Sequence, residues 1–355
     1  MVSLEELLLL LVKKGGSDLH IAAGVPPRIR VDGDLMPTEN EPMSPDDTQK
    51  IIYGLLNTAQ ISKFEKELEL DMSFGIESIG RFRVNVFRQR GAVGAVMRII
   101  PYSIKNFEQL GLSRATCEGL CNTLKGLVLV TGATGSGKST TLAAMIDFIN
   151  STYKGHILTV EDPVEFLHKH KSCLINHREV GTDTHTFSSA LKRALRQDPD
   201  VVLIGEMRDM ETTEAALTIS ETGHLAFATL HTSDCVQTIN RIIDIFPSHQ
   251  QQQVRTQLSF TLQAVFSQQL LPKAEGKGRV LASEIMIATP AIRANIRDSK
   301  IHQIYSSIQT GGKLGMRTMN QALHELYKAR QITYDTAMTY TTDPDDLKRI
   351  FEKGQ

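Results

Sequence analysis

The stretch that decides the fold runs from residue 126 to residue 139 and reads Gly126-Leu127-Val128-Leu129-Val130-Thr131-Gly132-Ala133-Thr134-Gly135-Ser136-Gly137-Lys138-Ser139. Its first part, Gly126 to Thr131, is an apolar run of strand length. A glycine-rich loop follows, and the residues from Lys138 onward are typical of a helix. Glycine supplies the backbone conformations that such a tight loop needs. A strand, a loop and a helix in this order predict a unit of an α/β domain.

Further apolar runs of strand length follow this loop. They are Ile157 to Val160, Val201 to Ile204 and Leu225 to Leu230, with segments of helix length between them. Strands that alternate with helices indicate a mostly parallel sheet. After Pro272 we expect a last strand, Arg279 to Ile287, and then a helical tail.

The first hundred residues predict a smaller α+β domain. A helix from Leu4 to Lys14 ends at a glycine pair, and a second helix begins near Pro45 and carries Ile51, Ile52 and Leu55. Five short strands are expected at 18–21, 28–31, 69–74, 80–90 and 91–100. The segment from Arg81 to Arg88 alternates polar with apolar residues, which predicts one face packed on a core and one face with a row of arginines. Pro101 begins a polar linker that extends to about Leu112.

Composition sets further bounds on the class of protein. A chain of 355 residues with 41% hydrophobic and 22% charged residues fits two globular domains. The net charge of −1 argues against a protein that coats nucleic acid. The four cysteines lack metal-site spacing and are interpreted as packed, reduced thiols. No signal peptide and no membrane-spanning run is recognised, so we expect a soluble, cytoplasmic protein that contacts membranes only through partners.

The glycine-rich loop predicts a nucleotide site. Gly132 to Ser139 satisfies the pattern G-x-x-x-x-G-K-[ST] and lies between a strand and a helix, as phosphate binding requires. Backbone N–H groups of the loop and the helix N-terminus would face the phosphates of ATP. Lys138 would reach the β- and γ-phosphates, Ser139 would hold Mg²⁺, and Thr140 could contact the α-phosphate.

Hydrolysis also needs a residue that activates water. Glu206 follows the apolar strand Val201 to Ile204, where an acid of the Walker B type belongs, and is the candidate base. Gly205 stands where the usual metal-binding aspartate would precede it. Glu161 and Asp162 follow another strand and could complete the shell of Mg²⁺ and water. A strand-end glutamate is ordinarily a solvated charge, but the loop in the same sheet favours the catalytic interpretation.

Two histidines bracket the strand Leu225 to Leu230. In a sheet of this kind the carboxyl ends of the strands face the phosphates. His231 lies at that end and is the better candidate to sense the γ-phosphate, whereas His224 could equally have a packing role.

These motifs, in this order, resemble those of the secretion-ATPase superfamily that powers type IV pili and type II secretion. The correspondence links Gly132–Ser139 to its Walker A motif, Thr159–Pro163 to its Asp box, Gly205–Asp209 to its Walker B motif and Gly223–Thr232 to its His box. The residue pair Gly205-Glu206 is the family's own pattern. Ser17 to His20 also matches the start of the family's N-terminal domain, so the resemblance covers nearly the whole chain.

In two features the sequence resembles the pilus-retraction branch of this family more than its assembly branch. The segment after Leu270-Leu271-Pro272 contains no cysteine, whereas assembly ATPases usually carry a tetracysteine zinc motif there, and the chain lacks room for their additional N-terminal domain. Residues 291–298, Ala-Ile-Arg-Ala-Asn-Ile-Arg-Asp, resemble the AIRNLIRE motif of retraction ATPases, with substitutions at 294, 295 and 298. From the residues alone this stretch is an amphipathic helix.

The resemblance implies a homohexamer that drives type IV pilus retraction and twitching motility. It implies a PAS-like N-terminal domain (1–100), a linker (101–112), a RecA-like P-loop ATPase core (113–290) and a C-terminal helical region (291–355), with ATP bound between the two domains. The family's two catalytic arginines correspond best to Arg83 and Arg98, with Arg81 as a further candidate. The implied partners are an inner-membrane platform protein and, through it, pilin.

Three alternatives stay open at this point. A nucleic-acid motor or RecA-like DNA-binding protein would share the C-terminal fold, although the neutral charge, 6% aromatic residues and absence of tryptophan disfavour a base-stacking surface. A regulatory paralogue would bind nucleotide without turnover, against which Lys138 and Glu206 argue. The third alternative is an assembly ATPase of the same family, which is the easiest to confuse with a retraction ATPase.

Overall fold

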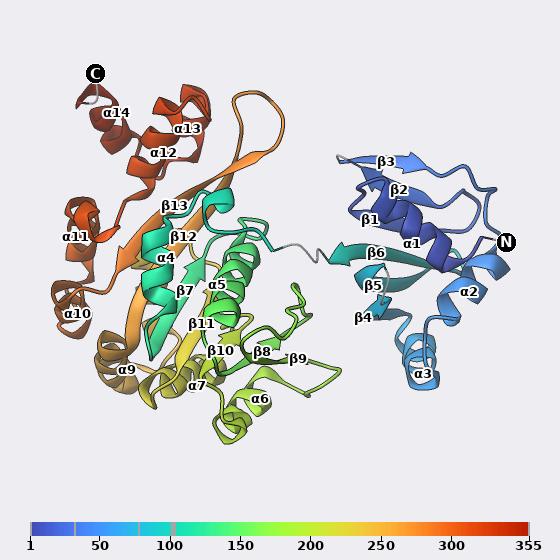
Figure 1. Ribbon diagram of the computed structural model, residues 1–355, viewed down its shortest axis with the longest axis horizontal. Helices are drawn as coiled ribbons and strands as arrows, with labels where there is room; N and C mark the ends of the chain where they lie inside the picture. Colours follow the sequence, from blue (N-terminus) through green and yellow to red (C-terminus); the bar gives the residue numbers. More distant parts are fainter. Residues whose placement is uncertain (1, 32, 77–78, 101–103, 354–355) are drawn as a thin grey trace. The chain divides into compact units, whose positions relative to one another are not determined.

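The computed structural model describes residues 2–31, 33–76, 79–100 and 104–353 and divides into two compact units (Figure 1). The first consists of Met1–Ser103 with Glu165–Leu167, and the second of Ile104–Val164 and His168–Gln355. Of the expected linker, residues 101–103 lie outside the described residues, and Glu108–Leu110 forms a 3-10 helix, η1.

The first unit is an antiparallel sheet with three helices. The strand order is β3-β2-β1-β6-β5-β4. The elements are α1 (Leu4–Lys13), β1 (Asp18–Ile21), β2 (Arg28–Val31), β3 (Asp34–Pro37), α2 (Pro45–Tyr53), α3 (Thr58–Glu67), β4 (Glu69–Ile76), β5 (Gly80–Gln89) and β6 (Ala92–Ile100). The helix expected near Pro45 therefore ends before Leu55, and Gly91 is not in a strand, because its φ of +79° forms the turn between β5 and β6.

The arginine face of β5 differs from the expectation in one respect. Phe82, Val84 and Val86 are buried, and Arg81 and Arg83 occupy the opposite face. Arg88 has the same parity as the buried residues, and its guanidinium lies 5.9 Å from the centre of the Phe64 ring. Side chains alternate strictly along a strand, so Arg88 does not belong to the polar row. That row continues across β6 instead, where Arg98 pairs in register with Arg83.

The second unit is built on a seven-stranded sheet in the order β13-β12-β7-β11-β10-β8-β9. The strands β12, β7, β11, β10, β8 and β9 are parallel, and β13 is antiparallel at the edge. Their bounds are β7 (Gly126–Thr131), β8 (His156–Glu161), β9 (Leu174–Glu179), β10 (Val201–Ile204), β11 (Leu225–Leu230), β12 (Leu262–Pro272) and β13 (Arg279–Ile287). The carboxyl ends of the parallel strands consequently share one edge.

Helices cover both faces of this sheet (Figure 1). One face packs against α4 (Arg114–Cys121) and α5 (Lys138–Thr152). The opposite face packs against α6 (Phe187–Ala194), α7 (Met210–Glu221), α8 (Cys235–Asp244), α9 (Ser248–Thr261), α10 (Pro290–Arg297) and α11 (Ile304–Thr310). Beyond them come α12 (Met319–Lys328), α13 (Tyr334–Tyr340) and α14 (Pro344–Lys353), with 3-10 turns η2 (Leu195–Gln197), η3 (Ile301–Gln303) and η4 (Gly312–Leu314). All four cysteines are buried and free.

Two strands of this sheet carry no clear sequence signal. β9 reads Leu-Ile-Asn-His-Arg-Glu and lies at the edge, where a largely polar strand is tolerated because one side faces solvent. β12 begins at Leu262, directly after α9 ends at Thr261, with no glycine or proline between them. Boundaries of this kind depend on the sheet partner rather than on local residues.

Candidate nucleotide-binding and catalytic site

The loop between β7 and α5 has the conformation of a phosphate cradle. Gly132, Gly135 and Gly137 have φ of +136°, +80° and +90°, which only glycine adopts readily. A Cβ at Gly132 would lie 2.3 Å from the carbonyl oxygen of Gln268 and 2.6 Å from Ser136 Oγ. Close packing of the loop against β12 therefore requires glycine at this position.

The side chains of the loop also fit a phosphate ligand. Lys138 is buried, and its Nζ donates hydrogen bonds to the carbonyl oxygens of Gly132 (2.8 Å) and Ala133 (3.1 Å). The N-cap of α5 is Gly137, which has no side chain to occupy the first N–H groups of the helix. Ser136 Oγ is buried and lacks a hydrogen-bond partner. Open helix N–H groups and a buried lysine suit an anion. Ser139 and Thr140 are half-buried in the first turn of α5.

Glu206 follows β10 and lies between two basic side chains. Its Oε2 is 2.8 Å from Nε of Arg208, and its Oε1 is 3.4 Å from Nε2 of His231. The Glu206 side chain is 21% exposed, so water can reach it. Arg208 also contacts Asp162 at 3.3 Å, and the hydrogen bond to Glu206 raises the pKa of Arg208 above its ordinary value.

Arg208 was not among the residues expected in the site. The signal for it was weak, because an arginine two residues after a glutamate is common in solvated loops. The structure gives it a role in holding one oxygen of Glu206, which leaves the other oxygen directed toward His231.

Gly205 occupies a position where the sheet leaves little room. A Cβ there would lie 3.2 Å from the Cα of Glu161 and 3.3 Å from the carbonyl oxygen of Val160, both on the neighbouring strand β8. The hydroxyl of Thr229 donates to the Gly205 carbonyl, and the Met207 N–H donates to the carbonyl of Thr229 (3.0 Å), so β11 fixes the turn. An aspartate at position 205 would press against β8, which gives a steric reason for glycine.

Glu161 ends β8, and its side chain is almost fully buried. Its Oε1 lies 3.7 Å from Nδ1 of His177 on β9. The backbone N–H of His168 donates to Nε2 of His177 (3.2 Å), so the ring proton is on Nδ1, which contacts Thr159 Oγ1 at 2.9 Å. His177 was missed from the sequence because β9 was not recognised as a strand.

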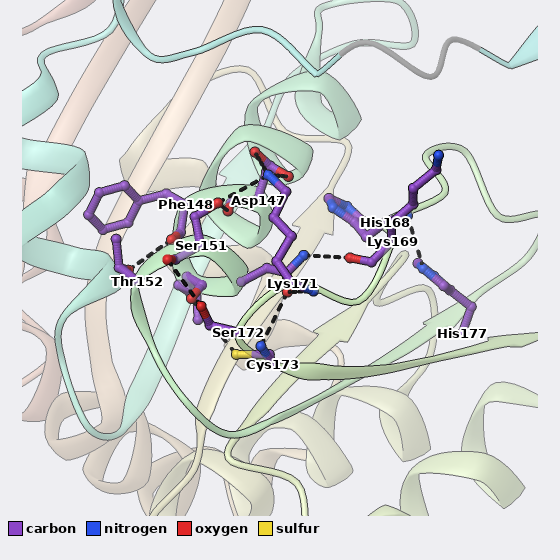
Figure 2. A network of polar contacts seen from close by, with 12 residues as sticks. Asp147, Phe148, Ser151, Thr152, His168, Lys169, Lys171, Ser172, Cys173 and His177 are labelled. Atoms are coloured by element: carbon purple, nitrogen blue, oxygen red, sulfur yellow. Dashed lines mark hydrogen bonds and ion pairs between the residues drawn. The ribbon is translucent and has the colours of Figure 1, made fainter.

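The segment between Glu161 and β9 is fastened to the helix that follows the phosphate loop (Figure 2). Nζ of Lys171 pairs with Asp147 at 2.7 Å, and the side-chain amide of Asn150 donates to the carbonyl of Lys169 (2.8 Å). The Asn150 side-chain oxygen accepts the backbone N–H of Lys171 (3.1 Å) and, at 3.4 Å, that of Cys173. The segment that carries Asp162 away from the sheet is thereby linked to α5.

The two histidines of β11 lie at opposite ends of the strand. His231 leaves β11 after Leu230, which pairs in register with Thr131, so His231 and Gly132 leave neighbouring strands at the same level. His224 lies at the other end, where its Nδ1 contacts the hydroxyl of Thr222 and the carbonyl of Ile219, both at 3.2 Å. The geometry therefore places His231, and not His224, beside Glu206.

Arg83 and Arg98 belong to the first unit, where they are register partners on one face. Nε of Arg98 pairs with Oδ1 of Asp18 at 2.8 Å. Burial alone would raise the pKa of Asp18, but the hydrogen bonds from Ser17 and Arg98 outweigh it and lower the pKa. Arg81 donates to Ser73 Oγ (2.7 Å). The Arg83 side chain is exposed, and its contact with a nucleotide stays a prediction.

The segment 291–298 forms most of α10, with Ile292 and Ile296 buried. Arg293 donates to the carbonyl oxygens of Ala288 (2.9 Å), Ser259 (2.8 Å) and Phe260 (2.9 Å) and to the side chain of Gln263 (3.0 Å). Its side chain therefore satisfies the last carbonyl groups of α9 and joins α9, α10 and β12. This gives the arginine a structural role, and a function of the segment in retraction stays a prediction.

Within the part of the chain that the structure describes, no helix has the length and apolar composition to cross a bilayer.

Comparison with known proteins connects this geometry to a family. A family model described as "Type II/IV secretion system protein" matches residues 2–341. The type IV pilus retraction ATPase PilT of Pseudomonas aeruginosa is 49% identical over 98% of this chain and 100% of that protein. A twitching motility protein of Neisseria gonorrhoeae is 47% identical over 88% of this chain and 83% of its own length.

A solved structure agrees with these matches. The crystal structure of the pilus retraction motor PilT with bound ADP superposes with a TM-score of 0.93 at 49% identity, over 98% of this chain and 100% of that one. This chain has the fold expected from the sequence, with a parallel sheet in which the phosphate loop follows β7. The motif resemblance, the family model and the fold therefore agree, and the chain belongs to the type II/IV secretion system protein family.

Proposed function

We propose that this chain is a motor ATPase that hydrolyses ATP to drive type IV pilus retraction and twitching motility. The observation that carries the proposal is Glu206, held between Arg208 and His231 at the same sheet edge as an intact phosphate loop. The 49% identity with a pilus retraction ATPase over nearly the full chain supports the biological role.

The residues have separate tasks in the proposed reaction. Gly132 to Thr140 would bind ATP, with Lys138 on the β- and γ-phosphates and Ser139 on Mg²⁺. Mg²⁺, when bound, neutralises charge on the phosphate oxygens. Glu206 would accept a proton from the attacking water, whose oxygen bonds to the γ-phosphorus while the bond to the leaving ADP oxygen breaks. His231 would contact the γ-phosphate, and Glu161 would complete the polar shell.

Arginines of the first unit would supply the remaining positive charge. Arg83 and Arg98 lie opposite each other on rigid strands, so their backbone positions are fixed. Fixed charge of this kind stabilises a phosphoryl transition state without reorganisation. We propose that they contact the phosphates across the interface between the domain of residues 1–100 and the core of residues 113–290, in a homohexamer hinged at residues 101–112.

The proposed setting is the cytoplasmic side of the inner membrane. Sequential closure around the ring would turn a platform protein and withdraw pilin subunits from the filament. Residues 291–355 form the C-terminal helical region of each subunit in this proposal. No contact with nucleic acid is proposed.

The test compares wild type with Glu206→Gln. Glu211→Gln serves as a matched control, because Glu211 is an exposed carboxylate at the start of α7 that pairs with Lys192. We expect a hexameric mass for all three proteins and loss of at least about 100-fold in turnover only in Glu206→Gln, a size typical of a lost general base. Full turnover in Glu206→Gln, with ATP still bound, would show that another group activates water.

Cell assays separate the rival functions. If the chain drives retraction, its deletion should leave pili extended but immobile, whereas if it drives assembly, its deletion should leave cells without pili. Stimulation of ATP hydrolysis by single- or double-stranded DNA, with a monomeric mass, would favour the nucleic-acid motor instead. Binding of ATP by wild type with no turnover would favour the regulatory paralogue.

A further inference from the structure

A single buried carboxylate connects two helices of the second unit. Glu284 lies in the middle of β13 and is 3% exposed. Its Oε1 accepts the backbone N–H of Cys235 at 2.8 Å, and its Oε2 accepts the backbone N–H of Met319 at 3.3 Å. Cys235 and Met319 are the first residues of α8 and α12. Each oxygen of Glu284 thus binds the N-terminus of a different helix.

The pKa of Glu284 is raised above its ordinary value. Burial raises the pKa of Glu284, and the hydrogen bonds from the two backbone groups oppose that effect. A buried carboxylate is unfavourable unless hydrogen bonds replace water. The positive ends of two helices provide that replacement. Both helix ends are consequently held to one rigid strand.

The α8 side of this connection leads to the candidate site. Residues 232–234 join His231 to α8, and the hydroxyl of Thr238 in α8 contacts Thr232 Oγ1 at 2.6 Å. The same hydroxyl contacts Thr131 Oγ1 at 3.4 Å, in the last residue of β7 before the phosphate loop. A displacement of the first turn of α8 would therefore shift the residues next to His231 and Gly132.

A residue of β12 also fixes the segment between His231 and α8. Ser267, which pairs in register with Glu284, donates through its hydroxyl to the carbonyl of Ser233 at 2.8 Å. The segment after His231 is therefore fixed at its middle by Ser267 and at the start of α8 by Glu284. Of Ser267 and Glu284, Glu284 is the one that also accepts a hydrogen bond from α12, a helix of the C-terminal region.

The α12 side borders a small polar cavity. A cavity of about 170 Å³ is lined by Glu284, Tyr305, Met319, Asn320, Thr342 and Asp343. Asn320, the second residue of α12, donates to Asp346 of α14 at 2.8 Å, and Tyr305 of α11 donates to the same carboxylate at 3.1 Å. The first turn of α12 thus has free space on one side and bonds to α11 and α14 through Asp346. Met319 itself packs in a core with Leu271 and Ala282, so any adjustment of this turn has room only on the side of the cavity.

We propose that Glu284 is a positioning residue for ATP hydrolysis, which holds the segment between His231 and α8 and transmits its position to α12. The proposal rests on the ATPase function proposed above and extends it to the C-terminal helices. When the nucleotide displaces His231, the start of α8 moves together with the Glu284 carboxylate, and the longer bond from Glu284 to Met319 is the one that changes. Coupling of this kind is reciprocal, so a ligand that moves α12 also changes ATP hydrolysis.

The first experiment follows backbone amide hydrogen exchange in the full-length protein, with and without a non-hydrolysable ATP analogue. In wild type we expect peptides that begin α8 and peptides that begin α12 to change protection together. In Glu284→Gln the amide can accept only one N–H well, because its NH₂ group cannot accept the other. The nucleotide response at Met319 should then disappear while the response at Cys235 persists.

The kinetic readout separates positioning from binding. In Glu284→Gln we expect kcat to fall by about tenfold, the size expected when one hydrogen bond to a charged group is lost. The KM for ATP should change by less than about twofold, since the phosphate loop keeps its own contacts. Glu325→Gln is the matched control, because Glu325 is an exposed carboxylate on α12 that pairs with Arg317. It should leave both readouts at wild-type values.

A second variant keeps the test valid if Glu284→Gln folds poorly. Thr238→Val preserves the shape of the side chain and removes the hydroxyl that contacts Thr232. It should lower kcat and abolish the nucleotide response of α12 without changing protection in the absence of nucleotide.

Two outcomes would overturn the inference. One is a wild-type protein in which nucleotide changes protection at the start of α8 but not at the start of α12. The other is a Glu284→Gln protein with wild-type kcat, whose protection falls equally with and without nucleotide, because that pattern describes a structural role alone. Failure of the proposed function is recognised separately, since wild type itself would then show no ATP turnover.

Discussion

Replacing His168 with phenylalanine is expected to remove much of the stability loss on acidification from about pH 7.5 to about pH 5. The His168 side chain is buried, with 6% of the residue exposed, and its ring stacks on that of His177 with centroids 5.8 Å apart. Its Nδ1 has no hydrogen-bond partner. Burial, with a smaller contribution from His177, lowers the pKa of His168 from 6.5 to about 4, although Asp147 nearby opposes the shift.

The sign follows from proton binding in the two states. Between about pH 6.5 and about pH 4 the unfolded chain binds a proton at His168 and the folded chain does not. The free energy of unfolding therefore decreases as the pH falls through this window. The difference between 6.5 and about 4 corresponds to about 3 kcal/mol when fully expressed. At about pH 5 it corresponds to about 2 kcal/mol.

The assay is urea unfolding of wild type and His168→Phe at both pH values and one protein concentration. Phenylalanine keeps an aromatic ring on His177 but does not titrate. We expect His168→Phe to be more stable than wild type by about 2 kcal/mol at pH 5, relative to the difference at pH 7.5. His249→Gln, which changes an exposed histidine, should behave like wild type. Equal losses in wild type and His168→Phe would refute a neutral, buried His168.

Three further substitutions test the site and the packing around it. Gly132→Ala should weaken binding of a fluorescent ATP analogue by at least about tenfold, because the new Cβ would lie 2.3 Å from the Gln268 carbonyl at a φ of +136°. An unchanged affinity would contradict this account of the loop. Arg293→Met should lower the free energy of unfolding by about 1–3 kcal/mol in denaturant titrations, since the last carbonyl groups of α9 lose their charged donor. Asp18→Asn should destabilise the first unit at pH 7, and its difference from wild type should shrink as the pH falls below about 4, because the pKa of Asp18 is lowered in the folded state. A difference that does not decrease at any pH below about 4 would exclude the ion pair with Arg98 as its cause.

Local patterns in the sequence were enough to locate the central strands and the phosphate loop. Gly126–Thr131, Val201–Ile204 and Leu225–Leu230 are observed with the expected bounds. Each is a short apolar run that is followed directly by glycine or histidine. A strand that is buried in a parallel sheet requires an apolar run of this kind. The same reasoning placed Glu206 and His231 at the carboxyl ends of their strands, because a parallel sheet gathers those ends at one edge.

The edge strand β9, and β12, which directly follows a helix, were not predictable from such local patterns. β9 is half polar because it lies at the edge, and β12 follows α9 without a break. Missing β9 also meant missing His177, whose contact with Glu161 depends on the pairing of β8 with β9. Arg88 lies on the same face of β5 as Phe82, Val84 and Val86, so the expected row of arginines does not extend to the end of the strand.

The sequence by itself therefore determined the family, the α/β fold and the residues from which the candidate site is drawn. Those properties depend on residue types at short spacings, which can be read without knowing what lies across the sheet. The tertiary structure decided which oxygen of Glu206 meets Arg208, why position 205 has little room for a side chain, and how Glu284 joins α8 to α12. Those properties depend on distances between residues far apart in the chain, which only strand register and helix packing set.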